Sequence, residues 1–490
     1  MNKTHLYSSI LLISLTACSG EAPQNAATDA APAATLSALD AAIAAMGVDD
    51  LQTLTYNGEA WRVRNSFRQT RAASPPWPER DTITTYQRTL DFSDPQRPSS
   101  RATGETFASN LFLEPPVPGT YEQNIPASQQ NWGQQLEIWL TPWGFLKGAE
   151  FYGATESTQQ LDGRDVTAIS WQSPESQLSP GGLRYTVTGY LDGDNRIQRV
   201  ETRVEDAFMG DMLVAALYSG YRDFDGVQVP TTMEQQRGSG GVFGVEVSDA
   251  SPNPADAATL LSFPAAPAGG GGQGGPGGAP TAALTQIGEG LWSVNGGYTA
   301  LVIEFSDHIV VFEAGQSEAW GEQVLAAAQA QFPDKPIRYL VNSHPHSDHT
   351  AGMVPFVRAG VTVVTHELNV PFLNMALSTP RTLLGEATLD PQFMSEVGAL
   401  TVLEDDTNRL ELHHVPTLHS EGMLVGLLPK QRVLFQADFT LPQPGAEPNP
   451  FVVDLANYVD SNALDFDAYL AVHAAQNPQT RADLMATIGK

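Results

Sequence analysis

Cysteine and basic residues are scarce in this sequence, and each scarcity excludes a class of function. Cys18 is the one cysteine among 490 residues, so the body of the chain has no thiol for a metal site or a nucleophile. Lysine and arginine total 26 against 55 aspartates and glutamates, and the formal net charge of −29 would repel a phosphate backbone. We therefore expect a protein that does not bind nucleic acid and whose chemistry rests on histidine and aspartate.

Histidine is also absent from the first part of the chain apart from His5. The other nine of the ten histidines follow residue 300, so residues 36–264 hold none and are not expected to be catalytic. This block does hold six of the eight tryptophans, and we expect them to pack in its core and on its sheet faces. A ligand groove lined by these aromatic rings is the alternative.

The N-terminus has the pattern of an export signal. Lys3 precedes a short apolar run, Ile10–Ile13, which is too short to span a membrane, and small residues follow it. Leu15-Thr16-Ala17-Cys18 resembles a bacterial lipobox, which implies cleavage after residue 17, a lipidated Cys18 and a tether over residues 18–35. The residue after Cys18 is Ser19 rather than an aspartate, which resembles the sorting pattern of lipoproteins at the periplasmic face of the outer membrane. A plain signal peptide with an incidental cysteine is the alternative.

Residues 36–264 are predicted to form a mostly antiparallel β domain that begins with a short helix. Apolar residues at helical spacing and a terminating glycine favour the helix over residues 36–47. Alternating apolar residues and hairpin turns favour strands at Leu54–Val63, Thr82–Phe92, Leu136–Leu140, Leu183–Leu191, Ile197–Val204 and Val227–Gln235. Residues 265–281 are rich in glycine and proline and indicate a flexible linker to a second domain, residues 282–490.

The second domain is predicted to alternate strands and helices. This alternation favours sheets sandwiched between helical layers. The expected strands are Leu291–Val294, Tyr298–Phe305, His308–Glu313, Ile337–Val341, Val361–Thr365 and Leu410–Val415, and the expected helices are Trp320–Phe332 and Thr350–Arg358. Thr440–Asn457 is rich in proline and is expected to be a loop.

Residues 343–349 concentrate the chemistry of the chain. Ser343-His344-Pro345-His346-Ser347-Asp348-His349 directly follows an expected buried strand, and a loop at a strand end can turn three imidazoles and a carboxylate toward one point. Imidazole nitrogens and a carboxylate oxygen suit zinc, with manganese or iron as alternatives, whereas calcium and magnesium prefer oxygen ligands. The alternative is an ordinary polar loop with surface histidines.

This segment resembles the His-x-His-x-Asp-His signature of the metallo-β-lactamase-fold hydrolase superfamily. Three further motif positions of that family are matched in order by His419, Asp438 and His473. Glu313 stands where the family usually has an aspartate and could order the metal loop. The resemblance covers residues 284–490 and implies a four-layer αβ/βα sandwich.

The resemblance also implies two zinc ions per chain and a hydrolytic reaction. A hydroxide that bridges the two metals would attack the substrate, and Asp348 would accept a proton. One metal would be held by His344, His346 and His419, the other by Asp348, His349 and His473, and Asp438 would bridge them. His308 is expected on a strand surface, and His366, His413 and His414 are left out of the ligand set.

Asp438 bears on the substrate that the resemblance implies. Broad-spectrum zinc β-lactamases typically carry cysteine or serine at this position, whereas aspartate is usual in thioesterase, lactonase and phosphodiesterase branches. We therefore expect a metallohydrolase of an ester, lactone, thioester or similar small molecule. A zinc β-lactamase and a non-catalytic metal- or ligand-binding lipoprotein are the alternatives.

Cys18→Ala tests the expected lipid anchor. The wild-type protein should sediment with the outer membrane, because several acyl chains anchor a protein stably. The variant should appear in the soluble fraction on immunoblots of fractionated cells. Membrane association that survives the substitution would contradict lipidation at Cys18.

Overall fold

The computed structural model describes residues 36–64, 66–77, 79–108, 117–129, 131–238, 240–264, 281–296, 298–394, 397–443, 445–473 and 479–490. The expected signal peptide, Cys18, the tether and nearly all of the expected linker lie outside these ranges. Residues 38–490 form one compact unit by their internal contacts. None of the described helices combines the length and apolarity that crossing a membrane requires.

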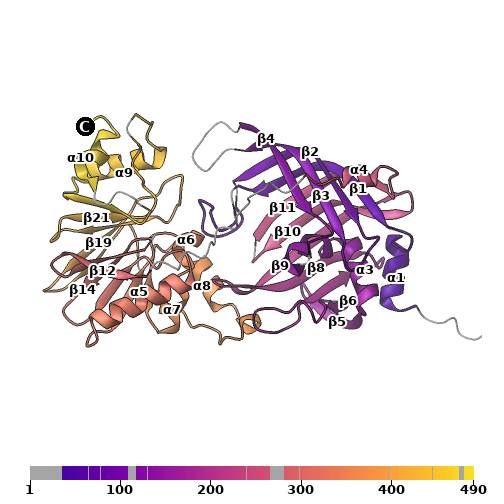
Figure 1. The fold of residues 1–490 in the computed structure, drawn as a ribbon, viewed down its shortest axis with the longest axis horizontal. Helices are drawn as coiled ribbons and strands as arrows, with labels where there is room; N and C mark the ends of the chain where they lie inside the picture. The colour runs from indigo at the N-terminus through magenta and orange to yellow at the C-terminus, as the bar shows by residue number, and fades with distance from the viewer. Residues whose placement is uncertain are drawn as a thin grey trace, which may run out of the picture. The chain divides into compact units, whose positions relative to one another are not determined.

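The N-terminal region is built on one antiparallel sheet, the N-terminal sheet, with strands ordered β4-β3-β2-β1-β11-β10-β9-β8-β7-β6-β5 (Figure 1). Strands β1 and β11, which are far apart in the sequence, pair in the interior of this sheet. The strands are β1 (Thr53–Val63), β2 (Arg80–Asp91), β3 (Ser99–Ala108), β4 (Val117–Ile125), β5 (Thr155–Leu161), β6 (Arg164–Gln172), β7 (Thr186–Leu191), β8 (Ile197–Asp206), β9 (Gly210–Phe224), β10 (Val227–Arg237) and β11 (Gly240–Pro252). The predicted mostly antiparallel domain is confirmed.

Four helices accompany this sheet: α1 (Ala38–Met46), α2 (Trp132–Trp139), α3 (Pro142–Tyr152) and α4 (Ala257–Leu260). Helix α3 contacts β6, β7 and β8. Trp139 and Trp143 from the helices and Trp171 from β6 are all buried, and Trp139 meets Trp171 edge-on at 5.4 Å. These three side chains pack in the core, as predicted for the tryptophans of this region.

The strand predicted over Leu136–Leu140 is wrong, because these residues lie in and just after helix α2. Asn131 caps the helix by accepting from the Gly133 N–H, and apolar side chains at helical spacing, including Trp132 and Leu136, are buried. Sequence reasoning also missed strands such as β4 and β5. Most of their residues are exposed, so neither shows the alternation of a half-buried strand.

The C-terminal region forms two mixed sheets that face each other. Their strand orders are β12-β13-β14-β15-β16-β17 and β18-β19-β20-β21-β22-β23. The first contains β12 (Ala283–Gly288), β13 (Leu291–Asn295), β14 (Ala300–Glu304), β15 (Ile309–Phe312), β16 (Ile337–Val341) and β17 (Thr362–Val364). The second contains β18 (Leu400–Glu404), β19 (Arg409–His414), β20 (Leu424–Leu428), β21 (Val433–Gln436), β22 (Ala468–Ala471) and β23 (Gln479–Thr480).

Helices cover the outer faces of these two sheets. Figure 1 shows α5 and α7 on the outer side of the first sheet and α9 and α10 on the outer side of the second, which gives the expected four-layer αβ/βα sandwich. The described helices of the whole C-terminal region are α5 (Glu318–Gln331), α6 (Ser347–Thr350), α7 (Val354–Arg358), α8 (Val370–Ser378), the 3-10 helix η1 (Thr382–Leu384), α9 (Pro450–Ser461) and α10 (Arg481–Ala486). Apolar side chains from both sheets, such as Phe312 and Phe435, fill the space between them.

Three local predictions for this region are wrong. The helix expected over Thr350–Arg358 is broken, because the Gly352 N–H donates to the Gly315 carbonyl instead of continuing the helix. The loop expected over Thr440–Asn457 ends in helix α9, whose first position is Pro450, a residue suited to a helix start. His308 is buried rather than on a strand surface, and its ring stacks on Phe305 at 4.8 Å.

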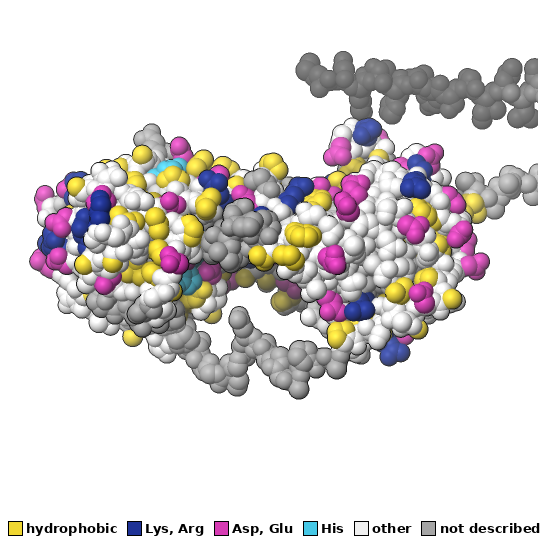
Figure 2. All heavy atoms as spheres, turned by 90° about the horizontal axis from the view of Figure 1, so that it is seen from above, with side chains coloured by type: hydrophobic (Ala, Val, Ile, Leu, Met, Phe, Trp, Pro, Cys, Tyr) yellow, Lys and Arg dark blue, Asp and Glu magenta, His cyan; other side chains and the backbone are white. Residues whose placement is uncertain are grey.

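Acidic side chains do not gather into one patch on the face drawn in Figure 2. They are interspersed there with basic, polar and hydrophobic side chains. The acidic side chains on that face therefore do not mark a docking surface there.

Arg381 provides a test of the contacts that hold the segment after α8. Its buried side chain pairs with Glu386 through Nε at 2.6 Å and donates to the Ala207 carbonyl at 2.8 Å. Arg381→Met leaves these acceptors without the guanidinium, and we expect it to lower the free energy of unfolding by about 3 kcal/mol. Urea unfolding measures this loss.

Arg358→Met is the matched control for Arg381→Met. It removes another guanidinium from Glu386, but Arg358 is 42% exposed. We therefore expect a loss below about 1 kcal/mol. Equal losses in the two variants would contradict the structural role of Arg381.

Candidate metal centre

The predicted ligands lie where strands of both sheets end. The parallel strands β15, β16 and β17 bring their carboxyl ends to one edge, and the segment that carries His344, His346, Asp348 and His349 leaves β16 there. His419 follows β19, Asp438 follows β21 and His473 follows β22. Rigid strands therefore bring together side chains that are far apart in the sequence.

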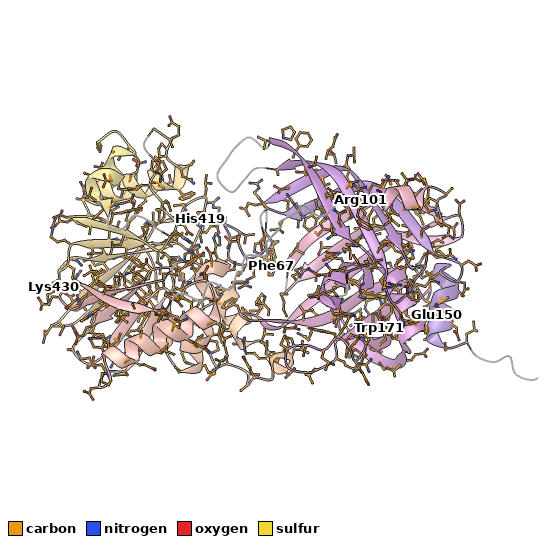
Figure 3. All side chains as sticks on the ribbon, in the orientation of Figure 1. Phe67, Arg101, Glu150, Trp171, His419 and Lys430 are labelled. Carbon is orange, nitrogen blue, oxygen red and sulfur yellow. The ribbon has the colours of Figure 1, made fainter. Side chains whose placement is uncertain are left out.

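The first group of potential ligands contains His344, His346, His419 and Asp438. One nitrogen or oxygen atom from each lies within 4.8 Å of the others. Asp438 Oδ2 is 3.0 Å from His344 Nε2 and 2.7 Å from His419 Nε2, and the two Nε2 atoms are 3.2 Å apart. His419, labelled in Figure 3, is nearly buried, and His344 is fully buried.

The second group contains Asp348, His349 and His473. Their ligand atoms also lie within 4.8 Å of one another. His473 Nε2 is 3.1 Å from His349 Nε2 and 3.3 Å from Asp348 Oδ2. The other oxygen of Asp438, Oδ1, is 2.7 Å from His473 Nε2 and 3.3 Å from His349 Nε2. Asp438 thus presents one oxygen to each group.

Contacts outside the two groups orient the imidazole rings. Glu313 accepts from the Ser343 N–H at 2.9 Å with Oε1, and its Oε2 is 3.0 Å from His349 Nδ1. Glu313 has a φ of 73°, a strained conformation for a residue other than glycine, and its side chain is buried. His344 Nδ1 is 2.9 Å from Ser343 Oγ. These contacts leave the Nε2 atoms of both histidines facing the ligand groups.

The residues fit a metal of the zinc type. Tetrahedral ligands about 2.1 Å from Zn²⁺ would lie about 3.4 Å apart, close to the observed separations between the donor atoms. His346 Nδ1 is buried and has no hydrogen-bond partner among the described residues, while Nε2 of the same ring is 3.1 Å from the Thr70 carbonyl. A ring held at one nitrogen, with the other turned into the ligand group, is the usual arrangement of a metal-binding histidine.

The electrostatics of the site favour a neutral His344 ring and positive charge near Asp438. Burial, together with the charge of His349, lowers the pKa of His344 to about 4, so its ring is neutral at pH 7. Burial lowers the pKa of His349, but Asp438 and Glu313 outweigh this effect and raise the pKa well above its usual value. For Asp438, burial raises the pKa, but the charges of His349 and His344 outweigh it and hold the pKa well below its ordinary value. Cations are therefore stabilised beside this carboxylate.

The remaining histidines of this region lie outside both ligand groups. His366 stacks on His414 with ring centroids 3.6 Å apart, and His414 Nε2 is 2.7 Å from the Glu421 carbonyl. His413 lies 3.2 Å from the Tyr458 hydroxyl.

Two neighbours of Asp348 were missed by sequence reasoning. The Tyr298 hydroxyl donates to Asp348 Oδ2 at 3.4 Å, and its ring meets His473 edge-on at 4.6 Å. Gln69 Nε2 donates to Asp348 Oδ1 at 2.9 Å, and Gln69 belongs to the N-terminal region, which has no histidine. The sequence does carry one sign of the long loop that contains Gln69. The interval between the expected strands that end at Val63 and begin at Thr82 is too long for a hairpin turn.

Residues 295–474 match the family model described as the metallo-beta-lactamase superfamily. The 2,4-dinitroanisole O-demethylase subunit alpha of Nocardioides sp. (strain JS1661) is 23% identical over 198 residues, which are 40% of this chain and 58% of that protein. The chain therefore spans little more than half the length of this curated relative.

Two solved structures are similar to the C-terminal region. A metallo-beta-lactamase from Pontibacter korlensis is 18% identical, with a TM-score of 0.34, and the match covers 42% of this chain and 99% of that one. A metallo beta lactamase from Hirschia baltica is 19% identical, with a TM-score of 0.33 and coverage of 42% and 96%.

Glu313→Gln tests the orientation of His349. The amide cannot both accept from the Ser343 N–H and accept from His349 Nδ1, so the ring loses the contact that turns its Nε2 atom toward the second ligand group. We expect metal affinity at the second group to fall about 10- to 100-fold. Competition with a chromophoric chelator measures it, and Glu318→Gln on helix α5 is the control. Unchanged affinity in Glu313→Gln would refute this role.

Proposed function

We propose that the protein is a hydrolase that uses two metal ions, because residues 295–474 match the family model of the metallo-beta-lactamase superfamily. Its substrate is an ester, lactone, thioester or similar small molecule. The observation that carries the proposal is Asp438, whose Oδ2 meets the first ligand group and whose Oδ1 meets the second. Zn²⁺ is the metal that this donor set favours, with Mn²⁺ or Fe²⁺ as alternatives.

The two ligand groups support a site for two metals. His344, His346 and His419 would hold one, Asp348, His349 and His473 the other, and Asp438 would contribute an oxygen to each. When bound, the two cations supply Lewis acidity and a nucleophile at neutral pH. The neutral state of His344 and the charged state of Asp438 favour this binding, because a metal ligand must be deprotonated.

Asp348 is the residue proposed to accept the proton during hydrolysis. Its side chain is 29% exposed and that of His473 is 27% exposed, whereas those of His344 and His349 are fully buried. Substrate therefore approaches from the side of Asp348 and His473. Burial raises the pKa of Asp348, but the hydrogen bond from His473 and the charge of His349 outweigh it and lower the pKa, so the carboxylate is ionised and able to accept a proton.

Tyr298 stands at the same open side. Its hydroxyl contacts Asp348, and burial together with the Asp348 charge raises its pKa above the ordinary value. Tyr298 is therefore a protonated hydrogen-bond donor at neutral pH. We infer that it orients Asp348 or donates to a substrate oxygen beside it.

The location of this activity is also a proposal. The lipobox-like segment that ends at Cys18 supports an exported protein anchored by lipid at the periplasmic face of the outer membrane. Its partners there would be the membrane and a small-molecule substrate, because the net charge of −29 disfavours nucleic acid.

A substrate panel tests the proposed reaction on the full chain loaded with zinc. The panel contains esters, lactones, thioesters, phosphodiesters and the β-lactam nitrocefin. An aryl methyl ether is added because the curated relative is named as an O-demethylase subunit. We expect turnover of a carbonyl ester, lactone or thioester. Nitrocefin turnover without turnover of these substrates would instead favour the β-lactamase alternative.

His346→Ala tests whether the ligand groups carry the activity. We expect close to two metals per wild-type chain, and at least about a hundredfold lower kcat/KM in the variant, because even outer contacts of metal ligands cost 10- to 100-fold. His413→Ala removes a histidine outside both groups and should retain metal and activity. A wild-type protein that is free of metal and inactive would support the binding-only alternative.

A further inference from the structure

The β1–β2 loop, of which the structure describes residues 64, 66–77 and 79, reaches the candidate metal centre from the N-terminal sheet. The Arg68 carbonyl accepts from the Ser347 N–H at 3.1 Å, and the Arg71 carbonyl accepts from the Glu421 N–H at 2.9 Å. Ser347 lies between His346 and Asp348, and Glu421 lies two residues after His419. The β1–β2 loop is therefore bonded to the two segments that carry most of the ligands.

Thr70 in this loop fixes the state of the His346 ring. Its carbonyl can only accept, so His346 Nε2, at 3.1 Å, must carry the proton and donate. In the neutral ring the lone pair then lies on Nδ1, the buried atom that has no partner among the described residues. Thr70 is itself nearly fully buried, which protects this bond from competition by water.

Gln69 holds the carboxylate of Asp348 in the second ligand group. Its Nε2 donates to Asp348 Oδ1 at 2.9 Å and to Ser347 Oγ at 3.0 Å. The Tyr298 hydroxyl and His473 lie at the other oxygen, Oδ2. Asp348 is thus held on both sides, and one of the holding groups comes from the N-terminal sheet.

The β1–β2 loop is anchored firmly enough to position these groups. Arg64 pairs with Asp81, which is buried, at 3.2 Å at the base of the loop. Phe67, labelled in Figure 3, packs against Trp77 with ring centroids 5.7 Å apart. These contacts tie the two ends of the loop to each other and to β2, so Gln69 and Thr70 are presented from a fixed base.

We propose that the β1–β2 loop positions two ligands of the metal centre. Gln69 orients Asp348, and the Thr70 carbonyl orients His346. This inference rests on the proposed metal-dependent function. In this proposal the N-terminal sheet contributes to metal affinity although it has no histidine. The direct ligands of the site all lie in the C-terminal region. Losing the Gln69 contact should therefore weaken the second metal and leave the first in place.

Two variants of the full chain separate a positioning role from a packing role. Gln69→Met keeps the length of the side chain and removes the donor. Gln69→Glu keeps the shape and places a second carboxylate against Asp348. Gln87→Met is the matched control, because Gln87 is also half-buried in the N-terminal sheet and its amide donates to Asn57, away from the ligand groups.

Stepwise Co²⁺ titration, followed by visible absorption and by chelator competition, reads the two metals separately. We expect the affinity of the second metal to fall about 10- to 100-fold in Gln69→Met. The affinities of the two variants should differ, because Gln69→Glu also removes the donor but adds a negative charge that attracts the cation. The absorption bands of the first Co²⁺ should stay as in the wild type, and Gln87→Met should behave as the wild type throughout.

The outcomes distinguish this inference from the proposed function. If the wild type binds two metals and both Gln69 variants match its affinities, the inference is overturned and the proposed function stands. Equal weakening in Gln69→Met and Gln69→Glu, with both metals affected, would indicate a packing role and also overturn it. A wild-type chain that takes up no metal would overturn the proposed function and this inference together.

Discussion

The structure depends on one carboxylate that is almost enclosed by imidazoles. Asp438 Oδ2 faces His344 and His419, while Oδ1 faces His349 and His473, all within 3.3 Å. A charge in such a buried position is costly unless cationic or hydrogen-bonding groups compensate it. The surrounding rings must therefore be held in fixed positions, and much of the C-terminal fold serves that requirement.

Strand ends and the core behind them meet this requirement. Phe312 immediately precedes Glu313, and it packs edge-on against Phe435, which lies on the strand before Asp438, at 5.0 Å. The inner faces of both sheets thus lock together directly behind the site. Close packing of this kind resists small shifts of the backbone, so the strand ends hold their side chains in place. The strained backbone of Glu313 is sustained by the same packing and by its two hydrogen bonds.

Sequence could predict those parts of the site that are encoded locally. His344, His346, Asp348 and His349 form a compact motif, and His419, Asp438 and His473 each follow an apolar strand, so the metal groups and the sandwich could be anticipated. Helix α2 was mistaken for a strand because its apolar residues are dense enough to suit either period. The edge strands β4 and β5 escaped because few of their side chains are buried.

The contribution of the N-terminal sheet could not be read from the sequence. Gln69 lies 279 positions from Asp348, and Thr70 lies 276 positions from His346. A glutamine side chain and a backbone carbonyl carry no motif, and only the folded chain shows that both meet metal-binding groups. A region that has no histidine can therefore still orient the ligands of a histidine-rich site.

Anomalous X-ray diffraction at the zinc edge, on crystals of the full chain grown with Zn²⁺, tests the central claim most directly. The account predicts two peaks, one on each side of Asp438, with His344, His346 and His419 around the first and Asp348, His349 and His473 around the second. Absence of any peak beside Asp438, or zinc bound only at other residues, would contradict it.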